Sequence, residues 1–192
     1  MISLRTLFAS FVGAALVCAA HANLVTNGSF ETGDFSGWLL SGNVGFTGVQ
    51  GNFSGVNPED GNFQAYFGAI GSTGSLDQDI STTAGDSYDV SFWLYNFGGT
   101  PNSFSASFGS TNLLSLTNAG SFPYTEYTYV ATATGSVTDL DFTIQQNPSY
   151  FLLDNISVTP AGVPDASMTV VLLGLGLASL AVGRRFCANP IA

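Results

Sequence analysis

The stretch Tyr88-Asp-Val-Ser-Phe-Trp-Leu-Tyr95 places a large apolar side chain at every second residue from Tyr88 to Leu94. Successive side chains of a β-strand point to opposite faces, so this period of two is typical of a strand with one face in a core. The same alternation recurs at 104–108, through Phe104, Ala106 and Phe108, and at 140–144. These patterns predict a protein built from β-sheets.

Further strands are expected on either side of this stretch, with residues typical of turns between them. The expected strands cover 63–67, 76–80, 127–133 and 150–158. The turn signals include Asn27-Gly28, Ala84-Gly85-Asp86, Gly98-Gly99-Thr100-Pro101 and Asn147-Pro148. No segment between the two ends of the chain has a helical period. Many short alternating strands at such spacing predict an all-β fold, an antiparallel β-sandwich.

Charge is distributed unevenly along the chain. All three basic residues, the one histidine and both cysteines lie near the two ends: Arg5, Cys18, His21, Arg184, Arg185 and Cys187. Residues 23–162 hold every acidic residue except Asp165. Nucleic-acid binding needs cationic side chains, which this segment lacks. The segment also lacks the side chains for a cysteine nucleophile, a Ser-His-Asp triad, a Schiff-base lysine or a zinc site built on His or Cys. Its chemistry is limited to carboxylates, hydroxyls, amides and aromatic rings.

The C-terminal segment, 163–192, combines three parts. Val163-Pro164-Asp165-Ala166-Ser167 is followed by an apolar run, 168–183, and then by Arg184-Arg185. This order resembles the PEP-CTERM class of sorting tails, and its VPDSG-type variant in particular, although Ala166-Ser167 stands where the type motif has Ser-Gly. The resemblance implies processing by an exosortase, with Val163, Pro164 and Asp165 as the sorting motif.

The same tail has a physical interpretation that is independent of the family. As a helix, 168–183 would be about 24 Å long, somewhat short of a hydrocarbon core of about 30 Å, and local thinning reduces the difference. Arg184 and Arg185 would mark the cytoplasmic end, because basic residues beside a span set its orientation. An ordinary single-span membrane anchor is the alternative.

The N-terminal segment, 1–22, has the pattern of a secretory signal peptide. Arg5 precedes an apolar stretch, 7–20, which closes with Ala20-His21-Ala22. This Ala-x-Ala signal predicts cleavage before Asn23 and export of the protein. Cys18 allows a lipoprotein alternative, which Val17 disfavours because a small residue is expected there. Three segments are therefore predicted: a signal peptide at 1–22, a sandwich domain at 23–162 and a sorting tail at 163–192.

Two motifs bear on the kind of sandwich. The opening Asn23-Leu-Val-Thr-Asn-Gly-Ser-Phe-Glu-Thr-Gly-Asp-Phe-Ser-Gly-Trp38 and the closing Phe151-Leu-Leu-Asp-Asn-Ile-Ser-Val158 resemble those of galactose-binding-like jelly rolls, the sandwiches of carbohydrate-binding modules. The resemblance implies that the first and last segments meet. It also implies a structural calcium there, held by Glu31 and Asp154 with carbonyls near Gly28. The alternative is that Glu31 caps a turn and Asp154 accepts backbone amides.

Trp93 and Tyr95 are the candidate residues for glycan contact. They are two residues apart and point away from the apolar row of 88–94. Aromatic rings exposed on one sheet face offer a surface on which sugar rings stack. If other segments cover that face, Trp93 is instead a buried packing residue. Trp38 is interpreted as a core residue.

Two pairs of carboxylates raise the possibility of catalysis. Asp77 and Asp79 share one side of a strand, as do Asp139 and Asp141. Residues two apart on a strand lie about 6–7 Å from each other, which is compatible with the carboxyl separation of glycosidases. A solvated outer face explains the same pattern. The sequence therefore predicts no enzyme, and a glycan hydrolase or lyase is the first alternative.

These observations together predict an exported, non-catalytic protein of the cell surface or extracellular matrix. The C-terminal helix would hold it at the membrane until the tail is processed, and the sandwich would then associate with extracellular polysaccharide. A membrane-anchored structural protein without a ligand is the second alternative.

Overall fold

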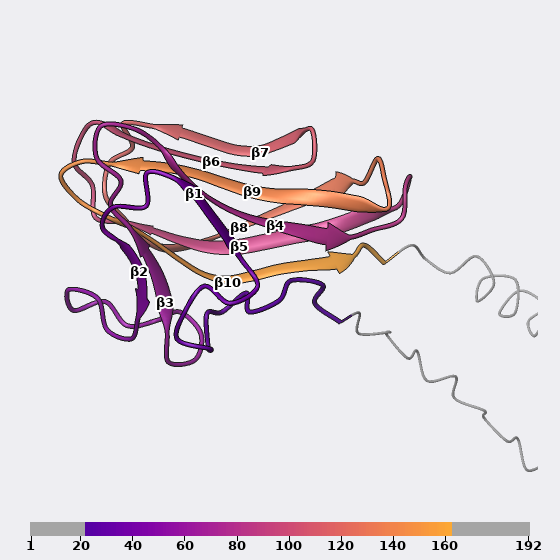
Figure 1. Cartoon of the computed structure of the whole chain (residues 1–192), viewed down its shortest axis with the longest axis horizontal. Coiled ribbons are helices and arrows are strands. Elements are labelled where there is room, and N and C mark those ends of the chain that lie inside the picture. The colour runs from indigo at the N-terminus through magenta and orange to yellow at the C-terminus, as the bar shows by residue number, and fades with distance from the viewer. Residues whose placement is uncertain (1–21, 163–192) are drawn as a thin grey trace, which may run out of the picture.

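The computed structural model describes residues 22–162, which form two five-stranded antiparallel sheets packed face to face (Figure 1). Sheet A has the order β1-β4-β9-β6-β7 and sheet B the order β2-β3-β10-β5-β8. The strands are β1 (Leu39–Gly42), β2 (Thr47–Gln50), β3 (Gln64–Phe67), β4 (Gly74–Ser81), β5 (Ser87–Asn96), β6 (Asn102–Phe108), β7 (Thr111–Thr117), β8 (Phe122–Thr132), β9 (Val137–Gln146) and β10 (Phe151–Pro160). The predicted all-β sandwich is confirmed.

The core between the sheets is rich in aromatic rings. Phe92 on β5 contacts Phe104 on β6 and Phe142 on β9 across the sandwich, with ring centroids 6.0 and 5.2 Å apart. Trp38, the residue before β1, contacts Phe142 and donates its indole N–H to the carbonyl of Asn27. Trp38 is buried, as predicted. The alternation along β5 and β9 therefore arises because every second side chain enters this layer.

The first described segment lies along the last strand, which confirms that the two ends of the domain meet. Leu24 donates its amide N–H to Val158, and Ile156 donates to the carbonyl of Gly28. A Cβ atom at Gly28 would lie 2.1 Å from the carbonyl oxygen of Ile156, so only glycine permits this approach. The opening segment is a series of turns rather than a strand.

Three strands were not predicted from the sequence: β1, β2 and β7. The first two have only four residues each. In β7 two adjacent leucines, Leu113 and Leu114, interrupt the alternation, and the register with β6 shifts nearby, between Ala106 and Ser107. Such an irregularity breaks the period of two on which strand prediction depends.

The structure contains no helix between residues 22 and 162 that is long and apolar enough to span a membrane. The predicted signal peptide, the apolar run 168–183 and the motifs at 163–167 and 184–185 lie outside the described residues. The division of the chain into three segments stays a prediction.

Candidate functional site

Trp93 and Tyr95 lie on the outer face of sheet B, opposite the core, where both are half-buried. Their predicted orientation is confirmed, whereas their contact with a glycan stays a prediction. The register places Asp154 of β10 on one side of Trp93 and Glu126 of β8 on the other. Tyr95 pairs with Leu152 of β10, whereas its register with β8 is irregular. Trp93 is therefore the middle residue of a row that crosses three strands.

Tyr95 belongs to a larger group of rings on this side of the molecule, here called the aromatic band: Phe53, Tyr66, Tyr95, Phe97, Tyr124 and Tyr150. Tyr95 contacts Phe97 and Tyr124, with ring centroids 4.7 and 5.7 Å apart. The ring of Phe53 contacts those of Phe97, Tyr66 and Tyr150, with ring centroids 4.7–6.0 Å apart. All but Phe53 are half-buried. Sequence reasoning missed most of the band because its members come from separate strands and connections.

The connection between β2 and β3, residues 51–63, covers part of the same outer face (Figure 1). Gln64, Leu152 and Asp154 point outward from sheet B but are fully buried. Gln64 donates to the carbonyls of Gly51 and Val56 at 2.6 and 2.8 Å and accepts the hydroxyl hydrogen of Tyr124. We call residues 51–63 the covering loop. Trp93 and Tyr95, on the same face, are only half-buried.

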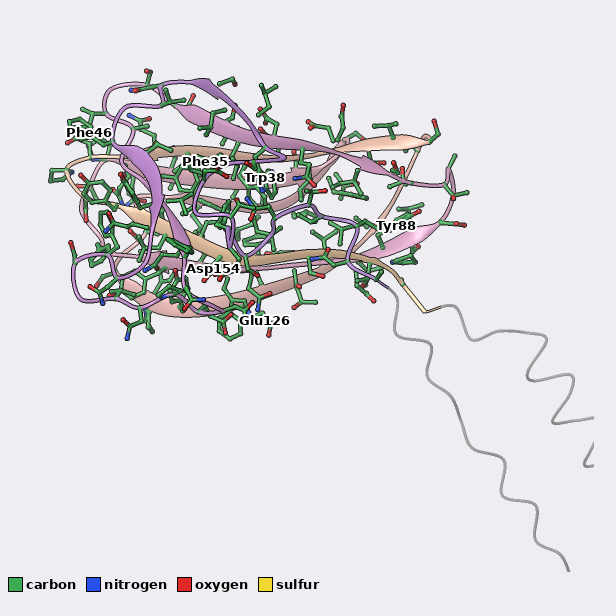
Figure 2. All side chains as sticks on the ribbon, turned by 60° about the horizontal axis from the view of Figure 1, so that its bottom comes forward. Phe35, Trp38, Phe46, Tyr88, Glu126 and Asp154 are labelled. Atoms are coloured by element: carbon green, nitrogen blue, oxygen red, sulfur yellow. The ribbon has the colours of Figure 1, made fainter. Side chains whose placement is uncertain are left out.

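Asp154 holds the covering loop to the sheet (Figure 2). Its carboxylate accepts the amide N–H groups of Glu59 and Asp60 at 2.8 and 3.1 Å, and that of Asn155 at 2.8 Å. The pairing of β10 with β5 is irregular between Asp154 and Ser157, and Asn155 donates to Glu59 there. Two consecutive side chains of β10 therefore contact one loop.

Burial raises the pKa of Asp154 to about 7 and outweighs the amide hydrogen bonds, which lower it. No basic side chain in residues 23–162 is available to offset the buried charge.

The pKa of Glu31 shifts in the opposite direction to that of Asp154. Burial alone would raise the pKa of Glu31, but hydrogen bonds from Asn62 and Phe63 at 2.7–3.1 Å outweigh it and lower that pKa. Both carboxylates thus bond the same loop, near its C-terminal end.

Calcium at Glu31 and Asp154 stays a prediction. The oxygens of both carboxylates face N–H donors, and the carbonyl of Gly28 accepts the amide of Ile156. Within residues 22–162 no three acidic, histidine or cysteine side chains are grouped so as to hold a metal ion. The hydrogen bonds are those of the alternative, in which Glu31 caps a turn and Asp154 accepts backbone amides.

The four remaining candidate carboxylates lie together on the outer face of sheet A. Asp77 of β4 pairs directly with Asp141 of β9, and Asp79 pairs with Asp139. Burial raises the pKa of Asp77 to about 7, and its hydrogen bond and charge repulsion with Asp141 add to the effect. Burial also raises the pKa of Asp139, and repulsion from Asp141 and Asp79 adds to the rise. Asp77 and Asp141 thus form a cross-strand pair of carboxyl groups in which burial and repulsion favour the protonated form of Asp77.

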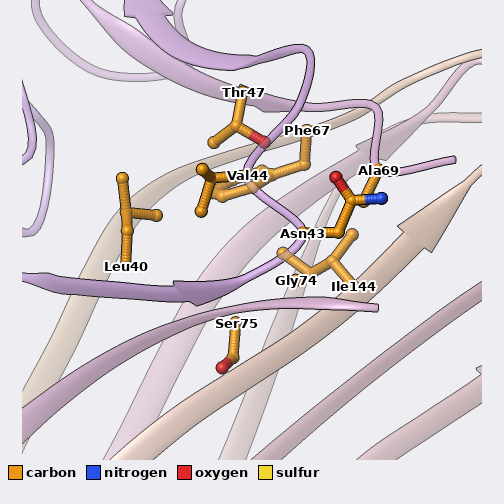
Figure 3. A pocket seen from close by; sticks show the side chains of 9 residues that line it. All are labelled: Leu40, Asn43, Val44, Thr47, Phe67, Ala69, Gly74, Ser75 and Ile144. Carbon is orange, nitrogen blue, oxygen red and sulfur yellow. The ribbon is translucent and has the colours of Figure 1, made fainter. Parts of the chain in front are cut away.

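A hollow of about 10 Å³, with room for about one water molecule, opens between the sheets near β1 (Figure 3). Its lining comes from Leu40, Asn43, Val44, Thr47, Phe67, Ala69, Gly74, Ser75 and Ile144. None of the four aspartates lines it. The candidate carboxylate pairs therefore lie on an open sheet surface rather than in this hollow.

These pKa shifts predict an unusual pH dependence of stability. Asp77 and Asp154 have folded-state pKa values of about 7, against 3.8 as the ordinary value. Between these values the folded chain binds more protons than the unfolded chain, so the free energy of unfolding falls as pH rises from about 4 to about 7. Glu31, with its lowered pKa, has the opposite effect only at lower pH. We expect melting temperatures to fall steadily from pH 4.5 to pH 7.5.

The Asp77→Asn and Asp154→Asn variants should each flatten this pH profile, because they remove the titrating groups. Asp86→Asn, in the turn before β5, is a control that removes one charge elsewhere. A wild-type melting temperature that rises between pH 5 and pH 7.5 would contradict the assignment.

The sequence model of the carbohydrate-binding domain family matches residues 22–152. The chain belongs to this family, whose members are binding modules rather than catalytic domains. No curated protein sequence matches the chain.

Solved structures show the same fold. The carbohydrate-binding module TmCBM61, in complex with β-1,4-galactotriose, is 19% identical over 73% of this chain and 99% of its own, with a TM-score of 0.60. The CBM22-1 xylan-binding domain from Paenibacillus barcinonensis Xyn10C is 14% identical over 77% of this chain and 99% of its own, with a TM-score of 0.53. The enzymatically active domain of bacteriophage CBA120 tailspike protein 4 is 14% identical over 72% of this chain and 21% of its own, with a TM-score of 0.56.

Proposed function

We propose that this domain binds a polysaccharide through the outer face of sheet B, with Trp93 and Tyr95 as the stacking surface. The observation that carries the proposal is the position of these two rings, half-buried and directed away from a complete core. The C–H face of a sugar ring is apolar, and stacking on an aromatic ring removes apolar area of both partners from water. Membership of the carbohydrate-binding domain family supports the same function.

Two features support a binding role for this face over the hydrolase alternative. The aromatic band adds the half-buried rings of Tyr124 and Tyr66 to the face that holds Trp93 and Tyr95. The candidate carboxylate pairs, by contrast, lie on sheet A, on the opposite side of the sandwich. An extended polymer would therefore lie along sheet B without meeting either pair.

Trp93→Ala and Tyr95→Ala test the proposal. The protein is purified in a polyoxyethylene detergent, which carries no sugar headgroup, and run by affinity electrophoresis in gels containing β-1,4-galactan, xylan or β-glucan. The wild-type chain should be retarded by at least one polymer, and Trp93→Ala should lose most of the retardation. Losing one stacked ring should weaken binding about tenfold or more, as for bases stacked on aromatic residues.

Leu39→Ala is the matched control, because Leu39 is exposed on the outer face of sheet A. If Leu39→Ala abolishes retardation and Trp93→Ala does not, the binding face is on the other sheet. If no polymer retards the wild-type chain, the structural role without a ligand is the better account.

We also propose that the protein is exported and sorted to the cell surface or extracellular matrix by an exosortase-type enzyme. The proposal rests on the sequence pattern at 1–22 and on the three parts of the tail at 163–167, 168–183 and 184–185. The permanent membrane anchor is the alternative.

Processing of the tail makes a direct prediction. In a host that has the sorting enzyme, mass spectrometry of the surface protein should find a chain that begins at Asn23 and lacks residue 168 onward. Replacing both Arg184 and Arg185 with alanine should reduce membrane retention, because the stop signal and the orientation signal are lost together. A surface protein that is intact through Ala192 would indicate the permanent anchor instead.

A further inference from the structure

Trp93 lies between two carboxylates in the row that crosses sheet B. Glu126 on β8 and Asp154 on β10 are both in register with it. Directly opposed residues of antiparallel strands have Cβ atoms about 4.5–5.5 Å apart, which is within contact range of their side chains. The stacking surface therefore has an acidic group on each side.

The two carboxylates differ in what they can offer to a ligand. Asp154 is fully buried, and its oxygens accept three amide hydrogens. Glu126 is exposed, and its carboxylate makes no hydrogen bond to any residue in the range 22–162 that the structure describes. Figure 2 shows Glu126 at the outer border of the sheet, apart from Asp154. Glu126 is thus the carboxylate that remains free to bond a sugar beside Trp93.

The surroundings of Trp93 are acidic and contain no basic side chain. Burial raises the pKa of Tyr124, whose ring contacts Tyr95, and the charges of Asp154 and Glu59 add to the rise. No lysine, arginine or histidine occurs between residues 23 and 162. A negatively charged polymer would meet uncompensated repulsion at this face, whereas a positively charged group would be attracted.

We propose that this site, resting on the polysaccharide binding proposed above, selects polymers that carry free amino groups and rejects polymers of uronic acids. A sugar ring stacked on Trp93 directs a neighbouring ammonium group to Glu126. The ammonium group donates a charge-assisted hydrogen bond to that carboxylate. The indole ring adds a cation–π attraction to the same group. Glu126 is the residue that determines selectivity, and Trp93 provides the stacking surface.

The experiment compares three forms of one polymer with the full-length protein in the same polyoxyethylene detergent. The starting material is the neutral polysaccharide that retards the protein most, its aminated form carries ammonium groups, and its oxidised form carries carboxylates. We expect the aminated form to bind about tenfold more tightly than the neutral form, the typical worth of one charge-assisted hydrogen bond. The oxidised form should bind more weakly than the neutral form. The preference should fall as salt rises.

Glu126→Gln separates the site from the general negative charge of the domain. It should remove most of the preference for the aminated form, measured as the ratio of the Kd values for the neutral and aminated polymers within the same variant. Asp79→Asn is the matched control, because it removes the same charge from an exposed position on sheet A. An equal loss of preference in both variants would show a non-specific charge effect and overturn the proposal.

The other outcomes are also distinguishable. If the neutral polymer binds through Trp93 but amination brings no gain, the proposed function stands and the selectivity is overturned. If none of the three forms binds, the proposed function fails, and the selectivity fails with it.

Discussion

Replacing Phe92 with alanine is expected to lower the free energy of unfolding by about 3–5 kcal/mol. Phe92 is fully buried on β5, and its ring contacts Phe104, Tyr127 and Phe142. Removing the ring loses its burial and leaves a cavity between the two sheets. Total stability of a domain is about 5–15 kcal/mol, so this one change threatens the fold. Urea unfolding of residues 22–162, followed by tryptophan fluorescence, measures the loss.

Trp93→Ala is the matched comparison, because Trp93 is the next residue and faces the other way. Its half-buried ring closes no core cavity, so we expect a smaller loss of about 1–2 kcal/mol from the apolar area that is exposed. A loss as large as that of Phe92→Ala would show that Trp93 is a packing residue. Such a result would remove it as a stacking surface before any polymer is tested.

Asp154→Ala is expected to cause the second large effect, a loss of about 3 kcal/mol. The change leaves three backbone amides without their acceptor, and a buried unsatisfied group costs about 1–3 kcal/mol. The summed loss of stability is limited because the covering loop can open and let water bond these amides. Limited proteolysis should then cut within residues 51–63 faster than in the wild type. Asp154→Asn keeps one acceptor oxygen and the volume of the side chain, so it should lose less.

The same variant tests the predicted calcium. An ion that binds only the folded state stabilises it by about 2.7 kcal/mol at a hundredfold excess over its Kd. Chelator should lower the melting temperature of the wild type but not that of Asp154→Asn. Magnesium at matched ionic strength controls for screening of the acidic residues. Identical melts with and without calcium would remove the predicted site and leave Asp154 as a hydrogen-bond acceptor for the loop.

The sequence predicted the parts of the fold that depend on local pattern. Alternation along β5 was enough to assign Phe92 to the core and Trp93 to the outer face, because a strand has only two faces. The same reasoning failed for β7, where Leu113 and Leu114 are adjacent. The opening segment resembled a known fold and does meet the last strand, but it does so through turns.

The candidate site was less predictable, because its contacts join distant parts of the chain. Asp154 and the amide of Glu59 are 95 residues apart in sequence, and nothing local connects them. The pairing of Asp77 with Asp141 and of Trp93 with Glu126 depends on the register between strands, which the sequence pattern does not specify. The sequence pattern predicted the face on which single residues such as Trp93 lie, whereas the rows and pairs that they form required the structure.

Hydroxyl-radical footprinting of the full chain, with and without the polysaccharide that it binds, tests the binding face most directly. Oxidation of Trp93 and Tyr95, read by mass spectrometry, should fall when the polymer is added, because a stacked sugar shields their rings. Phe46 is exposed at one end of the sandwich (Figure 2) and corrects for radicals that the polymer consumes, while Leu39 reports on the outer face of sheet A. The account predicts that oxidation of Trp93 and Tyr95 falls when the polymer is added. The ratio of Leu39 oxidation to Phe46 oxidation should stay the same. Protection of Leu39 with unaltered oxidation of Trp93 would contradict it.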